Sequence, residues 1–277
     1  MPHVLAQDLR DAVLQAALEG KLTSMQFDDT PPSVTSTCFS EEKEALLKMK
    51  KMKDRNSFGE ISEDELLFEI PDSWEWIRIN DVGIYKKGPF GSALTKSMFV
   101  PKGDQSVKVY EQKNAIQKNW KLGNYYITDD YFNSKMSGFE VEPGDIIVSC
   151  AGTIGETYVM PEGIEVGIIN QALMRMNIVE SVNLDYFMLV FDHILKDEAR
   201  KNSGGTAIKN IPPFEVFKAM PIPLPPIEEQ ARIVARVDEL MAKIDEYEKI
   251  EKELVELHKA FPGNMKDAIL QAAMQGK

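Results

Sequence analysis

The sequence has few of the residues that hold small extracellular or metal-dependent proteins together. Of its 277 residues only two are cysteines, Cys38 and Cys150, and only three are histidines. Two thiols cannot form a framework of disulfides, and so few Cys and His residues argue against a structural zinc site. The longest apolar run, residues 186–191, is far shorter than the roughly 20 residues that span a bilayer, and Met1-Pro2-His3 does not open a signal sequence. We therefore predict a soluble, cytoplasmic protein without a bound metal.

Positive charge is also scarce, since 32 Lys and Arg residues stand against 44 Asp and Glu residues, for a net charge of −12. Such a balance argues at first against nucleic acid, whose phosphates attract clustered Lys and Arg. The charge is uneven, however. Residues 1–70 have a net charge of −6, whereas residues 86–135 contain nine lysines and only four acidic residues, a net charge of +5. One internal segment therefore has the charge that DNA binding requires.

Polar and aromatic side chains are interleaved with these lysines. Lysine neutralises phosphates, and Gln or Asn can pair with adenine in the major groove. The predicted DNA contacts in this segment are Lys86, Lys87, Phe90, Lys108, Tyr110, Gln112, Lys113, Asn114, Lys118 and Asn119. We expect Lys86, Lys87, Lys113 and Lys118 to contact phosphates rather than bases. An ordinary solvated loop is the alternative interpretation of the same residues.

A second candidate for DNA contact is a glycine-rich stretch, where the backbone could approach phosphates closely. Its members are Ser203, Gly204, Gly205, Thr206 and Lys209. A plain turn between a helix and a strand explains the same glycines equally well.

An internal repeat links the two ends of the chain. Residues 9–21 read LRDAVLQAALEGK and residues 265–277 read MKDAILQAAMQGK, with eight of thirteen positions identical. Each copy is rich in helix-forming residues and ends at Gly-Lys, a helix stop signal. Two merely similar amphipathic helices are one interpretation. The other is that the chain begins with the first helix of one unit and ends where a second unit would begin.

Periodicity predicts an α+β protein with short helices at both ends. We expect an N-terminal helix within residues 1–25, then a linker and a short helix (residues 41–53) within 26–70. Strand-like runs at 76–79, 107–110, 145–148 and 172–176 indicate an irregular β-rich domain over 71–225, with a helix at 183–201. A long coiled-coil helix should occupy 226–261, after a stiff proline-rich connector, and a C-terminal helix 262–277.

The long helix has one narrow apolar stripe. Its predicted interface residues are Ile233, Val237, Leu240, Ile244, Tyr247, Leu254 and Leu257. A helix of this length cannot bury such a stripe by itself, so it needs a partner helix in this chain or in another. We expect self-association of two copies through residues 227–261 as an antiparallel pair.

Residues 221–241, PIPLPPIEEQARIVARVDELM, resemble the linker signature of type I restriction–modification specificity subunits, which has the form PIPLPPxxEQxxIVxxxDEL. In that family the signature joins a target-recognition domain to a spacer helix. Residues 144–149 (GDIIVS) and 152–155 (GTIG) are similar to the family's GDIxxS and GTIG core. The helix at each end is similar to its segment-junction helices.

The resemblance implies a subunit that binds double-stranded DNA at a specific sequence and is not catalytic by itself. It would direct separate modification (methyltransferase) subunits and a restriction (translocase and nuclease) subunit to that site. S-adenosylmethionine, ATP and Mg are then expected on those partners, and no cofactor in this chain. The family's usual subunit has two recognition domains and two spacers, whereas this sequence has one of each. It therefore resembles half a subunit, and two copies could read two inverted half-sites.

Several catalytic patterns are present only in part. Asp72 after Pro71, with Glu111 and Lys113, spells a PD…ExK nuclease pattern made of short and common pieces. Residues 210–214 (NIPPF) resemble the adenine-methyltransferase tetrad, but Ile211 stands where that tetrad needs an Asp or Asn. Cys150 and His193 could be imagined as a thiol pair, although a buried thiol and a surface histidine explain them better. We predict no catalytic residue. The alternative function is a coiled-coil scaffold protein, or an orphan DNA-binding regulator without enzyme partners.

Overall fold

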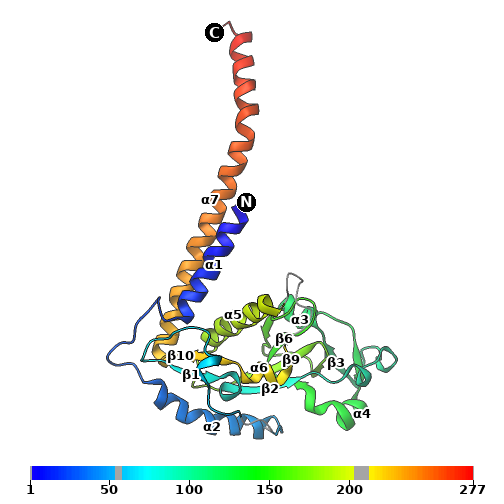
Figure 1. Ribbon diagram of the computed structural model, residues 1–277. Coiled ribbons are helices and arrows are strands. Elements are labelled where there is room, and N and C mark those ends of the chain that lie inside the picture. Colours follow the sequence, from blue (N-terminus) through cyan, green and yellow to red (C-terminus); the bar gives the residue numbers. More distant parts are fainter. Residues whose placement is uncertain (1, 54–57, 203–211, 277) are drawn as a thin grey trace. The chain divides into compact units, whose positions relative to one another are not determined.

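The computed structural model describes residues 2–53, 58–202 and 212–276. It is an α+β chain, which confirms the predicted fold class (Figure 1). The chain divides into two compact units. We name Met1–Ser24 with Arg232–Lys277 the helical unit, and Met25–Ala231 the β-rich unit. None of the helices in the described ranges is long and apolar enough to cross a membrane.

The helical unit pairs α1 (Pro2–Leu18) with α7 (Ile227–Met274), whose first turn belongs to the β-rich unit. Figure 1 shows α1 alongside the first half of α7. Ala17 and Leu18 of α1 and Ile233 and Val237 of α7 are all buried. The partner that the apolar stripe needs is therefore supplied, over this half, by the same chain.

Charged groups set the direction of this pair. Arg10 Nη2 lies 2.6 Å from Asp245 Oδ1 and 2.7 Å from Glu248 Oε2. Nearer the other end, Arg232 Nη2 donates to the backbone oxygen of Ser24 at 3.3 Å. Residue numbers rise along α1 as they fall along α7, so the two helices are antiparallel.

Helix α7 does not end at residue 261 as predicted. It runs through Pro262 to Met274 and so includes the second copy of the repeat. Proline removes one backbone hydrogen bond, but the residues that follow it, DAILQAAM at 267–274, are strong helix formers. Their propensity keeps the helix continuous beyond the proline.

The β-rich unit contains three sheets. A two-stranded sheet has the order β1-β10, and two four-stranded sheets have the orders β2-β9-β6-β7 and β4-β3-β8-β5. The strands are β1 (Glu75–Arg78), β2 (Gly83–Lys87), β3 (Ser106–Tyr110), β4 (Tyr126–Thr128), β5 (Glu140–Val141), β6 (Ile146–Ser149), β7 (Thr157–Val159), β8 (Gly167–Ile169), β9 (Leu173–Ile178) and β10 (Pro221–Leu224). All neighbours are antiparallel except β3 and β8. The four predicted strand runs are confirmed as β1, β3, β6 and β9.

Short helices connect and cover these sheets. The longer of them are α2 (Pro32–Met49), α3 (Gln112–Ile116), α4 (Asp129–Tyr131), α5 (Leu184–Asn202) and α6 (Phe214–Ala219). A π-helical turn, η5 (Phe132–Met136), follows α4, and 3-10 turns are η1 (Glu63–Glu65), η2 (Ile79–Val82), η3 (Gly91–Ala93), η4 (Lys96–Met98) and η6 (Ser137–Phe139). Helix α5 confirms the predicted helix at 183–201.

The segment that we expected to be a linker is part of the β-rich unit. Helix α2 begins at Pro32, nine residues before the predicted start. Proline suits the first helical turn, where the missing N–H has no partner to lose, so the Pro-Pro pair marks a helix start rather than a loop. Phe39 of α2 is buried, and Lys43 Nζ donates to the backbone oxygen of Asn80 at 2.7 Å. These contacts attach α2 to the sheet.

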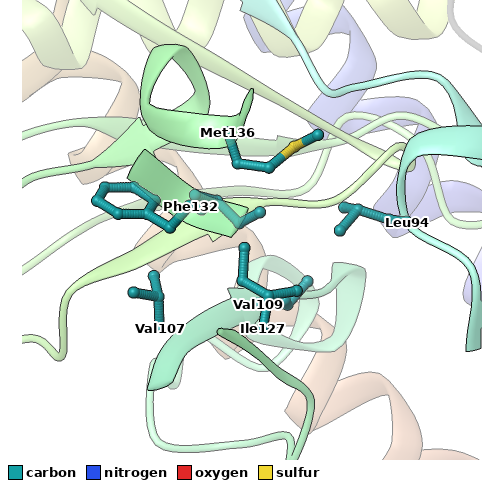
Figure 2. Close-up of a cluster of buried hydrophobic side chains, with 7 residues drawn as sticks. Leu94, Val107, Val109, Ile127, Phe132 and Met136 are labelled. Carbon is teal, nitrogen blue, oxygen red and sulfur yellow. The ribbon is translucent and has the colours of Figure 1, made fainter. Parts of the chain in front are cut away.

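Apolar side chains pack on both four-stranded sheets. Figure 2 shows Phe132 and Met136 of η5 over Val107 and Val109 of β3, with Leu94 and Ile127 completing the cluster. On the sheet β2-β9-β6-β7, Tyr85 meets Phe217 edge-on with ring centroids 5.4 Å apart, and Phe217 meets Phe191 of α5 at 5.8 Å. The sheets are therefore fixed from several sides, and their connecting loops start from a rigid frame.

The ends of the β-rich unit are tied together by the proline-rich connector. β10 pairs with β1 in the register Ile77 to Ile222. Directly after it, Glu229 accepts a hydrogen bond from Trp74 Nε1 at 3.1 Å. Gln230 accepts from the backbone N–H of Asn183 at 2.9 Å. Both side chains are buried, so the connector is not a free spacer but part of the core.

Asp145 of the GDI motif is the centre of a buried polar network. Its carboxylate accepts from Lys50 Nζ at 2.6 Å, from Asn177 Nδ2 at 2.6 Å and from the backbone N–H of Glu142 at 2.8 Å. Arg175 Nε lies 3.9 Å away. Asp145, Arg175 and the side chain of Lys50 are nearly inaccessible to solvent. The network joins the end of α2 to strands β6 and β9.

We expect Asp145→Asn to lower the free energy of unfolding by about 3 kcal/mol, because the buried cations of Lys50 and Arg175 would lose their charge partner. Urea unfolding monitored by circular dichroism measures this loss. The control is Glu142→Gln, whose half-exposed carboxylate also pairs with Lys50 and should cost less than about 1 kcal/mol. Equal losses for the two variants would contradict the central role of Asp145.

Candidate nucleic-acid interface

Three connecting segments meet at one end of the sheet β2-β9-β6-β7. Lys87 at the end of β2 faces Met174, and Ser149 at the end of β6 faces Leu173 at the start of β9. These pairings bring together three segments: the one after β2, the one after β6 and the one before β9. Helix α3 joins them, since Gln112 Nε2 donates to the backbone oxygen of Ala151 at 2.6 Å. We name this region the loop end of the sheet.

Glycine is required where the chain leaves β2. A Cβ atom on Gly88 would lie 1.9 Å from the backbone oxygen of Asn170, a distance that atoms do not tolerate. Gly88 N–H donates to the backbone oxygen of Leu173 at 2.9 Å, which holds the turn against the sheet. The next residues are thereby fixed, with Pro89 buried and the Phe90 ring 88% exposed.

A small hollow of about 110 Å³ opens at the loop end, lined among others by Lys87, Cys150, Gln171 and Phe214. Pockets that enclose small-molecule ligands are usually about 300–1,000 Å³. The hollow is too small for such a ligand. What this end of the sheet offers is a surface made of loops.

The structure separates the predicted DNA contacts into three groups. Lys87, Phe90, Lys118 and Asn119 are exposed, Lys86, Gln112 and Lys113 are half-buried, and Lys108, Tyr110 and Asn114 are buried. Ser203, Gly204, Gly205, Thr206 and Lys209 lie outside the described residues. Lys87 and Gln112 are brought together at the loop end, Phe90 follows Lys87 by three residues, and Lys118 and Asn119 follow α3. DNA contact by any of these residues stays a prediction.

The three buried residues have internal partners instead of facing solvent. Tyr110 donates from its hydroxyl to the backbone oxygen of Glu165 at 2.6 Å. Lys108 Nζ lies 5.5 Å from the centre of the Tyr126 ring and 3.4 Å from the backbone oxygen of Gly123. Burial lowers the pKa of Lys108 despite the opposing influence of Glu165. Lys108 and Tyr110 in β3 and Asn114 in α3 are thus buried in the folded chain, which does not favour their predicted contact with DNA.

Asn114 holds the loop that contains Lys118 and Asn119, two other predicted DNA contacts. Its Oδ1 accepts from the backbone N–H of Glu111 at 2.7 Å, and its Nδ2 donates to the backbone oxygens of Asn119 and Leu122, each at 2.9 Å. This one buried side chain spans residues 111–122. Asn114 thus positions the exposed Lys118.

The half-buried lysines are also engaged. Lys86 Nζ lies 4.7 Å from the centre of the Phe139 ring, and burial lowers its pKa with a smaller contribution from Arg175. Lys113 Nζ lies 2.8 Å from Glu111 Oε2. A phosphate would have to compete with these contacts, so Lys87 and Lys118 are the better placed of the four lysines predicted to contact phosphate.

A basic run at the end of α2 is not among the predicted DNA contacts. Lys48, Lys51 and Lys53 are exposed there, while Lys50 points inward to Asp145. The run lies within residues 1–70, whose net charge is −6, and averaging over that block hid it. A shorter window along the sequence would have found the cluster.

The predicted interface residues of the long helix also differ in their exposure to solvent. Ile233, Val237 and Ile244 are buried within the helical unit and Leu240 is half-buried. Tyr247, Leu254 and Leu257 are exposed, as are Ile250, Phe261, Met265, Ile269, Leu270 and Met274 farther along α7. Self-association of two copies through residues 227–261 stays a prediction, but the first half of the stripe is already buried in the folded chain. The apolar surface left open lies in the second half.

The incomplete catalytic patterns lie only partly within the described residues. Asp72 is exposed in the turn before β1, and Glu111 is paired with Lys113. In the described ranges, His, Cys, Asp and Glu residues do not gather in threes as metal ligands would. Asn210 and Ile211 lie outside the described residues. Nothing in these positions supports the nuclease pattern.

Fold and surface together define a class of protein in which a rigid β-rich frame presents polar loops and a helical unit presents an apolar stripe. The family model for the type I restriction modification DNA specificity domain matches residues 71–256. The chain belongs to this family, as the linker signature indicated.

Its relatives include specificity subunits of known enzymes. The chain is 30% identical over 243 residues to the specificity subunit of the type I restriction enzyme EcoAI from Escherichia coli, and 30% identical over 248 residues to that of EcoEI from the same species. Each match covers 87% of this chain and 40% of the relative. A solved HsdS subunit from Thermoanaerobacter tengcongensis aligns with 99% of this chain and 58% of its own, with a TM-score of 0.46 and 16% identity. The chain thus spans about 40% of the length of the curated relatives that it matches.

Cys150 provides a test of the packing at the loop end. Burial raises the pKa of its thiol to about 12, whereas Cys38 on α2 is exposed. Because the thiolate is the reactive form, we expect iodoacetamide at pH 8 to modify Cys38 and spare Cys150 in the folded protein. Peptide mass spectrometry measures the modification, and both thiols should react in urea. Rapid modification of Cys150 without denaturant would show that this end of the sheet is open.

Proposed function

We propose that this chain is the DNA-reading part of a type I specificity subunit. In this proposal the β-rich unit binds one half of a bipartite site in double-stranded DNA. The observation that carries it is that the family model, residues 71–256, covers the sheets whose loop end presents Lys87 and Phe90 and the loop that presents Lys118. The relatives of this chain include specificity subunits of type I restriction enzymes, which supports the same role.

The proposal assigns assembly, not chemistry, to this chain. Its helices would direct modification subunits and a restriction subunit to the DNA site, and the bound S-adenosylmethionine, ATP and Mg would be on those partners. The helical unit has the apolar surface that docking requires, whereas the described residues show no catalytic constellation among the patterns considered above. We expect the protein to act in the cytoplasm, where such partners meet DNA.

The exposed apolar residues in the second half of α7 suggest that a second copy of the chain binds there. Residues 246–256 contain five glutamates and two lysines, a net charge of −3, and residues 257–276 have a net charge of +1. Two copies in parallel would place the acidic segments side by side. In an antiparallel pair centred near Phe261, each acidic segment would instead lie beside residues 266–276 of the other copy, which include Lys266 and have no net charge.

We therefore propose that two copies of this chain associate through residues 247–274 as an antiparallel helix pair. Such a dimer of half units would read two identical, inverted half-sites at a fixed spacing. The proposal differs from the sequence-based one in its contact residues, since Ile233, Val237 and Ile244 are already buried within the helical unit.

The function is tested by reconstitution. Alone, the purified chain should bind duplex DNA but neither transfer methyl groups nor cut DNA with Mg present. With a type I modification subunit and S-adenosylmethionine, it should give adenine methylation at one discrete bipartite site, mapped by sequencing. Methylation of the same site without this chain would contradict a specificity role. Mg-dependent cleavage by the chain alone, lost in Glu111→Ala, would revive the nuclease pattern.

The dimer is tested with Leu257→Asp combined with Ile269→Asp. Both side chains are exposed, so the double variant should keep its fold, and the charges should separate the pair. We expect light scattering to give a dimer mass for the wild type and a monomer mass for the double variant. Val34→Asp, an exposed apolar residue on α2, is the matched control and should remain a dimer. A monomeric wild type, or a double variant that stays dimeric, would rule out this interface.

A further inference from the structure

Two lysines have a backbone conformation that normally belongs to glycine. Among the described residues, the non-glycine residues with positive φ are Lys51, at 50°, and Lys118, at 47°. An L side chain in this left-handed region crowds its own backbone, so a residue other than Gly, Asn or Asp is uncommon there. That both exceptions are lysines in one protein calls for an explanation.

The two lysines occupy the same place in the same motif. Each is the second residue beyond a helix, α2 for Lys51 and α3 for Lys118. The next backbone N–H then closes the turn: Met52 donates to the oxygen of Leu47 at 2.8 Å, and Asn119 to that of Asn114 at 3.1 Å. This is the Schellman ending, in which the left-handed position is usually glycine.

The chain uses glycine for this ending in its other unit. Helix α1 ends with Gly20 at φ 68° and α7 with Gly276 at φ 69°. The closing bond after Gly20 runs from Lys21 N–H to the oxygen of Ala16 at 2.8 Å. The glycines thus end helices of the helical unit, whereas the strained lysines end helices of the β-rich unit, the one proposed to bind DNA.

The local structure does not need either ammonium group. The last carbonyls of α2 and α3 already accept backbone hydrogen bonds, among them Lys51 N–H to Lys48 at 3.2 Å and Lys118 N–H to Ala115 at 3.3 Å. Both side chains are exposed. Neither ammonium group forms a hydrogen bond or ion pair with any residue that the structure describes. Among the described residues, no contact of either ammonium group offsets the strain.

We propose that Lys51 and Lys118 are two phosphate contacts of the β-rich unit, each held at a fixed position by a closed helix ending. This inference rests on the proposed DNA-binding function and adds Lys51 to its predicted contacts. The neighbouring Lys50 pairs with Asp145 before the start of β6, so Lys51 lies away from the loop end of the sheet. The surroundings suit phosphate in both places. Lys118 lies in the segment of net charge +5, and Lys51 lies between the exposed Lys48 and Lys53, where Glu142 is already paired with Lys50.

A purely structural role makes a different prediction. A cation near the end of a helix interacts favourably with the helix dipole, which would stabilise the fold without any ligand. Replacing lysine would then lower stability and leave DNA affinity unchanged. A phosphate contact predicts the reverse, because glycine and asparagine both relieve the left-handed strain while removing the charge.

The experiment compares Lys51→Gly, Lys51→Asn, Lys118→Gly and Lys118→Asn with the wild-type full chain on a 30-base-pair random-sequence duplex. Each variant should bind roughly three- to tenfold more weakly, and the slope of log K against log salt should fall by about 0.9 in magnitude. The melting temperature should stay the same or rise by about 2–4 °C. Lys51→Arg and Lys118→Arg should keep wild-type affinity and slope.

Controls separate this inference from the function on which it rests. Lys48→Ala removes one exposed charge from the same helix, and a loss equal to that of Lys51→Gly would mean that net charge alone matters. Unchanged affinity and slope in the Lys51 and Lys118 variants, with a wild type that binds and with Lys87→Ala weakened, would overturn the inference but leave the function standing. Failure of the wild type to bind any duplex, alone or with a modification subunit, would remove the function itself.

Discussion

The β-rich unit depends on the way its two ends are joined. β1 and β10 pair across the whole intervening chain, and the first turn of α7 is then held by the buried side chains of Glu229 and Gln230. Glu229 accepts from Trp74 on one side of the unit, and Gln230 accepts from the backbone of Asn183 on the other. Because these bonds are buried, breaking them would leave polar groups unsatisfied, and the closure is correspondingly strong. The loops between the ends can therefore be long without loosening the frame.

The same closure explains why the proline-rich signature was informative in the sequence. Proline lacks an N–H and is confined to edge strands, and β10 is an edge strand in a sheet of two. Strands such as β6 and β9 were also predictable, because short apolar runs lie between clear turn residues. The start of α2 was not, since Pro31 and Pro32 favour a loop and a first helical turn equally well. Pro262 led to the opposite error, a helix end predicted where the helix continues. The helix formers after it outweigh one missing hydrogen bond.

The charge pattern of the sequence predicted which segment contains the candidate surface, but not which of its side chains face solvent. Lys108 and Lys118 belong to the same basic segment, yet one is inside strand β3 and the other follows a helix ending. The β3 sequence SVKVY begins with the polar and apolar alternation of a strand exposed on one face, yet four of its five residues are buried, so periodicity wrongly indicated that Lys108 faces solvent. The helical stripe has the same ambiguity. A pattern of apolar residues shows that a partner is needed, and only the fold shows that α1 supplies it for Ile233 and Val237.

These contrasts separate the residues that identify the family from those that could contact a ligand. Asp145, Glu229 and Gln230 are in the recognisable motifs, and all three are buried in polar networks. Lys87, Phe90, Lys51 and Lys118 are outside those networks and exposed, on segments whose backbones are fixed by Gly88 or by closed helix endings. Exposed side chains on a fixed backbone can be exchanged with little effect on the core. The frame can therefore stay the same while the surface that it presents is changed.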